Sequence, residues 1–153
     1  MDQLRISTAL QVGSTSDKVF KAIIDPEKMK NYFISHGTAM MHQGETVEWE
    51  FPEFPGAFPV RVLEVTENQK IIFEWDGDSK ALTVEIRLEA VNDGLATVVY
   101  VDEYGMENTA EGINWLKGNT AGWANFLACL KAYLEFGINL RKGGFDFMKK
   151  SDQ

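Results

Sequence analysis

The chain has 153 residues, of which 44% are apolar and 25% are charged, and this balance is typical of one soluble globular domain. It carries 15 basic and 23 acidic residues, so its formal net charge is −8 and it lacks the basic surface that nucleic acids and anionic membranes require. The single cysteine, Cys129, excludes an internal disulfide, and no apolar run is long enough for a membrane span or a signal peptide. We therefore expect one domain over 1–153, a cytoplasmic location, and no nucleic-acid or membrane partner.

The first part of the chain predicts one strand followed by two short helices. Apolar and polar residues alternate from Leu4 to Val12, which is the period of a strand with one buried face. Helix N-cap candidates at 14–17 then precede a helical apolar pattern over 19–24. Asp25-Pro26 ends this helix and begins a second one, over Pro26 to Tyr32.

The middle of the chain returns to the two-residue period and predicts an antiparallel sheet of six or seven strands. The clearest strand runs from Leu82 to Ala90, and the turn Asn92-Asp93-Gly94 joins it as a hairpin to a strand over 96–104. Acidic residues occupy the polar positions of these strands, so we expect one face of the sheet to be in water. The residues expected there are Glu48, Glu50, Glu85 and Glu89.

The last predicted element is a long amphipathic helix from Glu111 to about Leu140, ended by Gly143-Gly144. Its apolar residues repeat at spacings of three and four, which indicates one face buried on the sheet: Leu116, Thr120, Trp123, Leu127, Leu130, Leu134 and Ile138. A tail over 143–153 follows. Phe136 and the tail residues Phe145, Phe147 and Met148 are explained equally by a homodimer contact and by a tail folded onto its own domain.

The order of these elements, with particular residues, resembles the helix-grip fold of the START-like SRPBCC superfamily. The matching segments are Val19-Phe20-Lys21-Ala22, Asp25-Pro26-Glu27-Lys28, Tyr32-Phe33, Ile71-Ile72-Phe73-Glu74-Trp75, Tyr104-Gly105-Met106 and the helix Gly122-Trp123…Leu127…Leu130-Lys131-Ala132-Tyr133-Leu134-Glu135. The chain is most similar to homologues of the C-terminal domain of the heat-shock-protein-90 ATPase activator, over about residues 4–140. The resemblance implies an α+β domain in which a bent antiparallel sheet grips the last helix around a deep, mostly apolar cavity.

The function that this resemblance implies is the binding of a small hydrophobic ligand in the cavity. The superfamily also contains cyclases and hydrolases, so an enzyme that uses a cavity acid is one alternative. Asp102, Glu103 and Tyr104 end a strand where such an acid could act as a general base. The sequence contains no complete catalytic constellation, which favours a binding protein over an enzyme.

A protein-interaction module of the chaperone-activator kind is the second alternative. The co-chaperones that stimulate the chaperone ATPase carry an additional N-terminal domain, whereas one helix-grip domain fills this chain. We therefore expect this chain not to raise the steady-state ATPase rate of an Hsp90 chaperone, measured with increasing amounts of the chain. A saturable several-fold rise would restore the co-chaperone function.

The candidate ligand-binding residues are aromatic, because stacking and apolar contacts bind flat hydrophobic molecules. They are Phe33, Trp49, Phe73, Trp75, Trp115, Trp123 and Phe126, and core packing explains each of them as well. The resemblance places Trp115 and Trp123 over the open end of the cavity. The segment Pro52–Pro59 predicts a loop, either a stiff connector or a lid that holds Phe54 and Phe58 over the cavity mouth.

No cofactor and no metal are expected. The only histidines, His36 and His42, have no third ligand at a recognisable spacing, so we interpret them as exposed surface side chains. Cys129 has no histidine nearby in the sequence, and we expect an inert, partly buried thiol.

Overall fold

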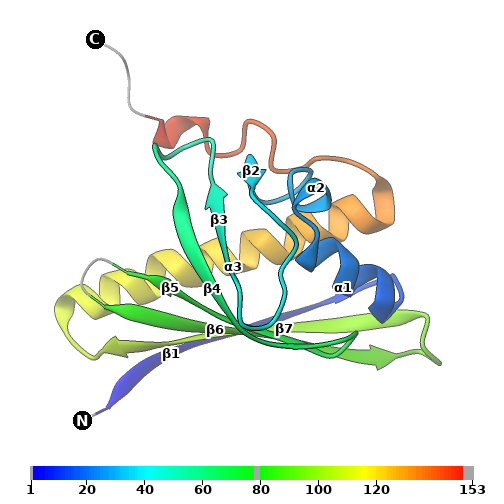
Figure 1. Cartoon of the computed structure of the whole chain (residues 1–153), viewed down its shortest axis with the longest axis horizontal. Coiled ribbons are helices and arrows are strands. Elements are labelled where there is room, and N and C mark those ends of the chain that lie inside the picture. The colour runs from blue at the N-terminus through cyan, green and yellow to red at the C-terminus, as the bar shows by residue number, and fades with distance from the viewer. Residues whose placement is uncertain (1, 78–79, 150–153) are drawn as a thin grey trace.

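The computed structural model describes residues 2–77 and 80–149, and its centre is an antiparallel sheet of seven strands (Figure 1). The strands are β1 (Gln3–Val12), β2 (His36–Gly37), β3 (Thr46–Glu50), β4 (Phe58–Thr66), β5 (Lys70–Asp76), β6 (Ala81–Val91) and β7 (Ala96–Glu107). Their order is β1-β7-β6-β5-β4-β3-β2, so β2 to β7 form a meander and β1 is added beside β7. The predicted helix-grip α+β fold is confirmed.

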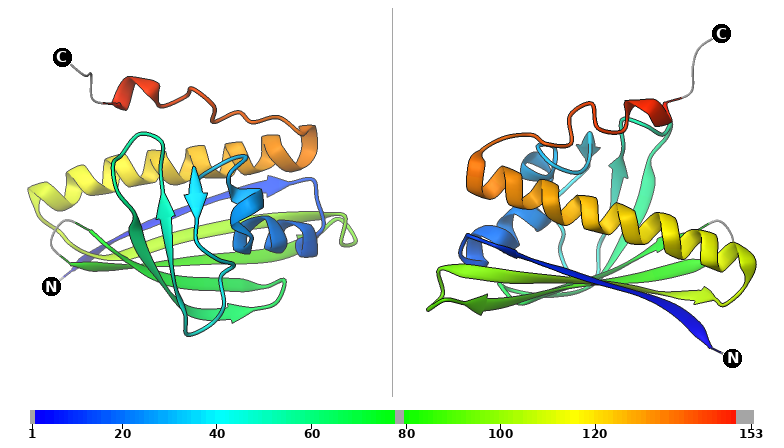
Figure 2. Two further views of the ribbon diagram at one scale, coloured as in Figure 1. Left: turned by 45° about the horizontal axis from the view of Figure 1, so that its top comes forward. Right: turned by 180° about the vertical axis from the view of Figure 1, so that it is seen from behind.

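Three helices accompany the sheet. The short helices α1 (Ser16–Ile24) and α2 (Pro26–Met29) carry the chain from β1 at one edge to β2 at the other. The long helix α3 (Ala110–Phe136) lies across one face of the sheet, and the tail that follows it contains a short 3-10 helix, η1 (Asp146–Met148) (Figure 2). None of the helices in the described part of the chain is long and apolar enough to cross a membrane.

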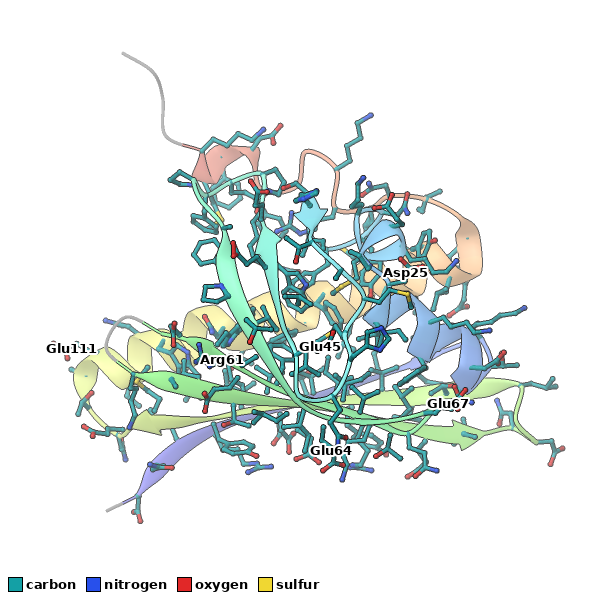
Figure 3. The ribbon with its side chains drawn as sticks, viewed as in Figure 1. Asp25, Glu45, Arg61, Glu64, Glu67 and Glu111 are labelled. Atoms are coloured by element: carbon teal, nitrogen blue, oxygen red, sulfur yellow. The ribbon has the colours of Figure 1, made fainter. Side chains whose placement is uncertain are left out.

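The two faces of the sheet differ as the alternation predicts. The inner face is apolar and packs against α3, with Ile6, Phe73, Val84 and Ile86 buried against Leu127 and Leu130. The outer face is polar: Glu48 and Glu89 are exposed, and Glu50 and Glu85 are half-buried. Charged side chains such as Glu64 and Glu67 extend away from α3, below the sheet in the view of Figure 3.

The long helix ends four residues earlier than the sequence analysis predicted. Gly137 takes a left-handed conformation with φ of 66°, and its N–H is bonded to the carbonyls of Ala132 and Tyr133, which closes α3 at Phe136. Gly143 and Gly144 lie in the tail, and the predicted helical residue Ile138 lies outside the helix.

The buried face of α3 is also wider than the single stripe that was expected. Trp123, Leu127 and Leu130 are buried as predicted, but Thr120 is exposed. Phe126 and Cys129 form a second buried row, because the segment after α2 packs there: the ring of Tyr32 lies 5.6 Å from that of Phe126. Cys129 is therefore a core residue.

The second short helix is shorter than predicted and ends at Met29. The carbonyl of Met29 accepts from the backbone N–H groups of Tyr32, Phe33 and Ile34, which turns the chain sharply instead of extending the helix. The turn buries Tyr32, whose hydroxyl donates to the carbonyl of Ala22 at 2.7 Å. Burial raises the pKa of Tyr32 well above its ordinary value, so this hydroxyl remains protonated.

Candidate functional site

An open cavity of about 1420 Å³ lies between the first half of α3, the sheet, the loop before β4 and the C-terminal tail. Small-molecule sites typically measure ~300–1,000 Å³, so this one has room for a ligand with several fused rings or a long chain. Seven of the nine aromatic residues singled out in the sequence line it: Phe33, Phe54, Phe58, Trp75, Trp115, Trp123 and Phe126.

Trp49 and Phe73, the other two, lie outside the lining. Their side chains are 1% and 0% exposed, and their ring centres are 5.4 Å apart in the core. Trp49 meets Trp75 edge to face at 6.2 Å. These two residues therefore form a packed layer behind the cavity wall.

Two cavity tryptophans are held by one buried carboxylate, Glu103 of β7. Its Oε2 accepts from Nε1 of Trp75 at 2.8 Å, and its Oε1 accepts from Nε1 of Trp123 at 2.8 Å and from Nδ2 of Asn119 at 3.1 Å. Hydrogen bonds to an ionised acceptor are shorter and stronger than neutral ones. Glu103 thus joins β5, β7 and α3 at the wall and sets the orientation of both indoles, whose ring centres are 5.7 Å apart.

None of the three residues proposed as a cavity acid presents a free carboxylate to the cavity. Glu103 is 0% exposed and lies behind the indoles that donate to it. Asp102 and Tyr104 lie on the outer face of the sheet, where Arg5 pairs with Asp102 at 2.7 Å and covers the Tyr104 ring at 4.5 Å. The expectation of a cavity-facing base at 102–104 is therefore corrected, because the strand alternates and Glu103 is already bonded.

A β-bulge bends β7 next to this site. The pairing of β1 with β7 shifts between Leu4 and Arg5, and it skips Gly105, whose φ of 115° strongly favours glycine. Met106 and Glu107 follow the bulge and line the cavity. The Tyr104-Gly105-Met106 segment therefore has a structural role at the cavity mouth.

Trp115 differs from the other two cavity tryptophans. Its Nε1 is buried, and it has no hydrogen-bond acceptor among the described residues. A buried donor without a partner costs roughly 1–3 kcal/mol, so such groups are rare in folded proteins. Nothing in the sequence separates Trp115 from Trp123 in this respect, since the difference depends on which indole reaches Glu103.

The C-terminal segment forms the outer wall of the cavity. It runs back from Gly137 beside α3 and meets the loop between β3 and β4 (Figure 2). There Arg141 makes two hydrogen bonds to Glu53, at 2.7 and 3.0 Å, with side chains only 15% and 4% exposed. The guanidinium also lies 4.8 Å from the ring centre of Phe145. Through residue 149, then, the tail folds onto its own domain.

The Pro-rich loop thus contacts the tail at the cavity mouth. The loop is shorter than the predicted segment Pro52–Pro59, because Phe58 and Pro59 begin β4 and pair with Trp49 and Glu48 of β3. Phe54 therefore lines the cavity from the loop and Phe58 from β4, and Phe145, Phe147 and Met148 line it from the tail. Phe136 remains 67% exposed at the end of α3.

Replacement of Arg141 by methionine is expected to detach the tail without unfolding the domain. Glu53 would lose its only described cation, and separation of the tail from the loop would let water reach the carboxylate. Hydrogen exchange of backbone amides over 138–148 should accelerate about tenfold or more, whereas the strands should keep their protection. Lys142→Met, at an exposed neighbouring residue, is the matched control; equal protection in the two variants would show that the ion pair does not hold the tail.

The histidines lie on the surface, as expected, whereas Cys129 is more deeply buried than the partly buried thiol that was expected. His36 and His42 are both exposed, and no group of three potential metal-ligating side chains occurs within 2–77 and 80–149. Burial raises the pKa of the Cys129 thiol, and the charge of Arg141 opposes this shift more weakly. A thiol in this state is a poor nucleophile at neutral pH.

A bent antiparallel sheet around a long C-terminal helix, with an aromatic cavity between them, defines a START-like helix-grip protein. Residues 14–135 match the family model described as Activator of Hsp90 ATPase homolog 1-like protein. The chain therefore belongs to this family.

Solved structures agree with this assignment. Protein SSP2350 from Staphylococcus saprophyticus is 30% identical, with a TM-score of 0.79 over 90% of this chain and 96% of that one. The Aha1 dimer from Colwellia psychrerythraea is 19% identical, with a TM-score of 0.74 over 88% and 98% of the two chains. DynU16, a putative protein in the dynemicin biosynthetic locus, is 24% identical with a TM-score of 0.78; the match covers 88% of this chain but 48% of DynU16, so this chain spans about half of its length. No protein of curated function matches the sequence.

Proposed function

We propose that this protein binds a small hydrophobic ligand in the cavity between the sheet and α3. The observation that carries this proposal is the cavity itself, of about 1420 Å³ and walled by aromatic side chains from the helix, the sheet, the loop and the tail. Burial of apolar ligand surface contributes about 25 cal/mol per Å², from which the entropy lost on association must be subtracted.

The arrangement of the wall supports binding by a largely preformed site. Glu103 fixes the indoles of Trp75 and Trp123, and Phe126 meets Trp123 edge to face at 5.2 Å. Rings that are already ordered lose little conformational entropy when a ligand stacks on them, so less of the contact energy is lost.

The proposal favours a carrier or sensor over an enzyme. A general base must reach the substrate, whereas Glu103 is covered by its three donors. Of the four carboxylates that do line the cavity, Glu53 is bonded to Arg141, Asp76 is bonded to Arg61, and Glu107 lies 3.8 Å from Lys80. The fourth, Glu111, is an exposed residue in the first turn of α3. Catalysis of the cyclase or hydrolase type has no comparable geometric support.

Native mass spectrometry of freshly purified protein tests the proposal directly. We expect a co-purifying small molecule, or saturable changes in tryptophan emission with members of a panel of sterols, fatty acids and flavonoids. Trp75, Trp115 and Trp123 line the cavity and would report on its occupancy. Absence of a bound molecule together with absence of any saturable response would refute the proposal.

A homodimer is a second, separate proposal. The relative from Colwellia psychrerythraea is described as a dimer, and this chain exposes Phe136, Ile138 and Leu140 by 67, 51 and 52% at the end of α3 and just beyond it. Sedimentation velocity over a range of concentrations tests this state, and Phe136→Ser should shift the protein toward monomer. A monomer at all concentrations would exclude the dimer. The cytoplasmic location stays a prediction from the sequence.

A further inference from the structure

Charged side chains at the cavity are mainly acidic. Four carboxylates line it, those of Glu53, Asp76, Glu107 and Glu111, against two cations, Lys80 and Arg141. Both cations face acidic partners: Arg141 is bonded to Glu53, and Nζ of Lys80 lies 3.8 Å from Glu107. No cation of the described lining is left without a carboxylate neighbour.

The remaining two carboxylates add negative charge. Asp76 bonds to Arg61 at 2.8 Å, which holds the pKa of Asp76 below its ordinary value, so it is ionised at neutral pH. Arg61 itself lies outside the lining and is shared with Glu74. Glu111 lies in the first turn of α3, at its outer end (Figure 3), and pairs with no basic side chain in the described part of the chain. Its charge offsets the partial positive charge of the helix N-terminus.

An anionic ligand head group would therefore enter a site with excess negative charge. Asp76 and Glu107 are 57 and 68% exposed and Glu111 is also exposed, so water weakens the repulsion, but a carboxylate ligand would find no free ammonium or guanidinium in the described lining to offset it. Apart from Glu111, the polar side chains of α3 with hydrogen-bonding groups at the cavity are the neutral amides of Asn114, Asn119 and Asn125.

One uncharged donor at the cavity is both buried and unused. The indole N–H groups of Trp75 and Trp123 are bonded to Glu103, whereas that of Trp115 has no acceptor among the described residues. A ligand oxygen could reach this N–H from the cavity by displacing the atoms that now cover it. The gain would exceed that of an ordinary hydrogen bond, because the donor is unsatisfied beforehand.

We propose that the cavity takes an uncharged aromatic ligand whose oxygen accepts from the Trp115 indole, and that it discriminates against carboxylate lipids. This inference deepens the proposed function and rests on it. The aromatic walls supply the affinity, the unused donor orients the ligand, and the acidic lining excludes fatty-acid-like molecules.

Three probes on one ring system separate these contributions: 2-acetylanthracene, 2-ethylanthracene and anthracene-2-carboxylate. Dissociation constants are measured at low ionic strength by tryptophan quenching and by calorimetry. We expect the ketone to bind about 5-fold more tightly than the hydrocarbon and at least about 10-fold more tightly than the carboxylate. In Trp115→Phe, the advantage of the ketone over the hydrocarbon should disappear, while hydrocarbon binding is largely retained.

Charge variants complete the test. Glu111→Gln should strengthen carboxylate binding about twofold, whereas Glu89→Gln, on the outer face of the sheet, should change none of the three constants.

A carboxylate that binds the natural protein as tightly as the ketone overturns the charge discrimination, and equal binding of ketone and hydrocarbon overturns the role of Trp115. Both comparisons use the natural protein, so either can overturn the proposal even if Trp115→Phe fails to fold. If none of the probes binds, the proposed function itself fails.

Discussion

Replacement of Glu103 by leucine is expected to lower the free energy of unfolding by about 3–5 kcal/mol. The substitution leaves one buried indole N–H group, that of Trp123, and two half-buried donors, those of Trp75 and Asn119, without their acceptor. A buried donor without a partner costs roughly 1–3 kcal/mol, and a half-buried one costs less because water can reach it. Urea denaturation followed by far-ultraviolet circular dichroism measures the loss.

Two further variants show whether this loss comes from the buried hydrogen bonds. Glu103→Gln should lose less, about 1–3 kcal/mol, because the amide oxygen can still accept from two donors while its NH₂ faces the third. Asp102→Asn, one residue away on the outer face, breaks only an exposed ion pair with Arg5 and should cost under about 1 kcal/mol. Equal stability of the Glu103→Leu variant and the natural protein would mean that the indoles find other acceptors.

Trp123→Ala should reduce both stability and ligand affinity. Truncation of a buried tryptophan costs about 3–5 kcal/mol of stability, and loss of a wall that touches the ligand should weaken binding by roughly 1–3 kcal/mol. Near-ultraviolet circular dichroism must first show that the variant is folded, after which titration with a ligand from the panel gives the affinity.

Trp49 supplies the matched control for this experiment. It is as large and as buried as Trp123, but it lies behind the wall rather than on it. Trp49→Phe should therefore lower stability with little change in affinity, and Trp123→Phe gives a milder change at the wall itself if the alanine variant does not fold. A folded Trp123 variant that binds as tightly as the natural protein would remove this residue from the site.

The sequence predicts the sheet well because each strand has one face toward the solvent and one toward the core. The alternation from Leu4 to Val12 and from Leu82 to Leu88 survives in the structure as alternating burial. The predicted end of α3 was wrong because the sequence offers two glycine signals there, Gly137 and Gly143-Gly144. Gly137 comes first, and it takes the left-handed conformation that ends the helix.

The site was harder to predict from the sequence than the sheet, because its hydrogen bonds and ion pairs join residues that are far apart in the sequence. Glu103 shares the inward positions of β7 with Val99 and Val101, and a charged residue at a buried position signals that partners exist. The alternation cannot identify Trp75 and Trp123 as those partners. Similarly, Glu53 and Arg141 are 88 residues apart, and only the folded tail brings them together.

The pairing of β1 with β7 has a consequence for how the chain reaches its native state. Gln3 lies opposite Glu107, and Val12 opposite Thr97, so β1 is bonded to the strand of this sheet that lies farthest from it in the sequence. During synthesis β1 has no partner until about one hundred residues have followed it, and α3, which contacts β1, comes later still. Contacts so far apart in sequence are slow to form, because the loop-closure entropy is lost before they stabilise the chain. The charged Arg5 and the polar Ser7 and Gln11 on the outer face of β1 make the unpaired strand less apolar, which disfavours its association with strands of other molecules.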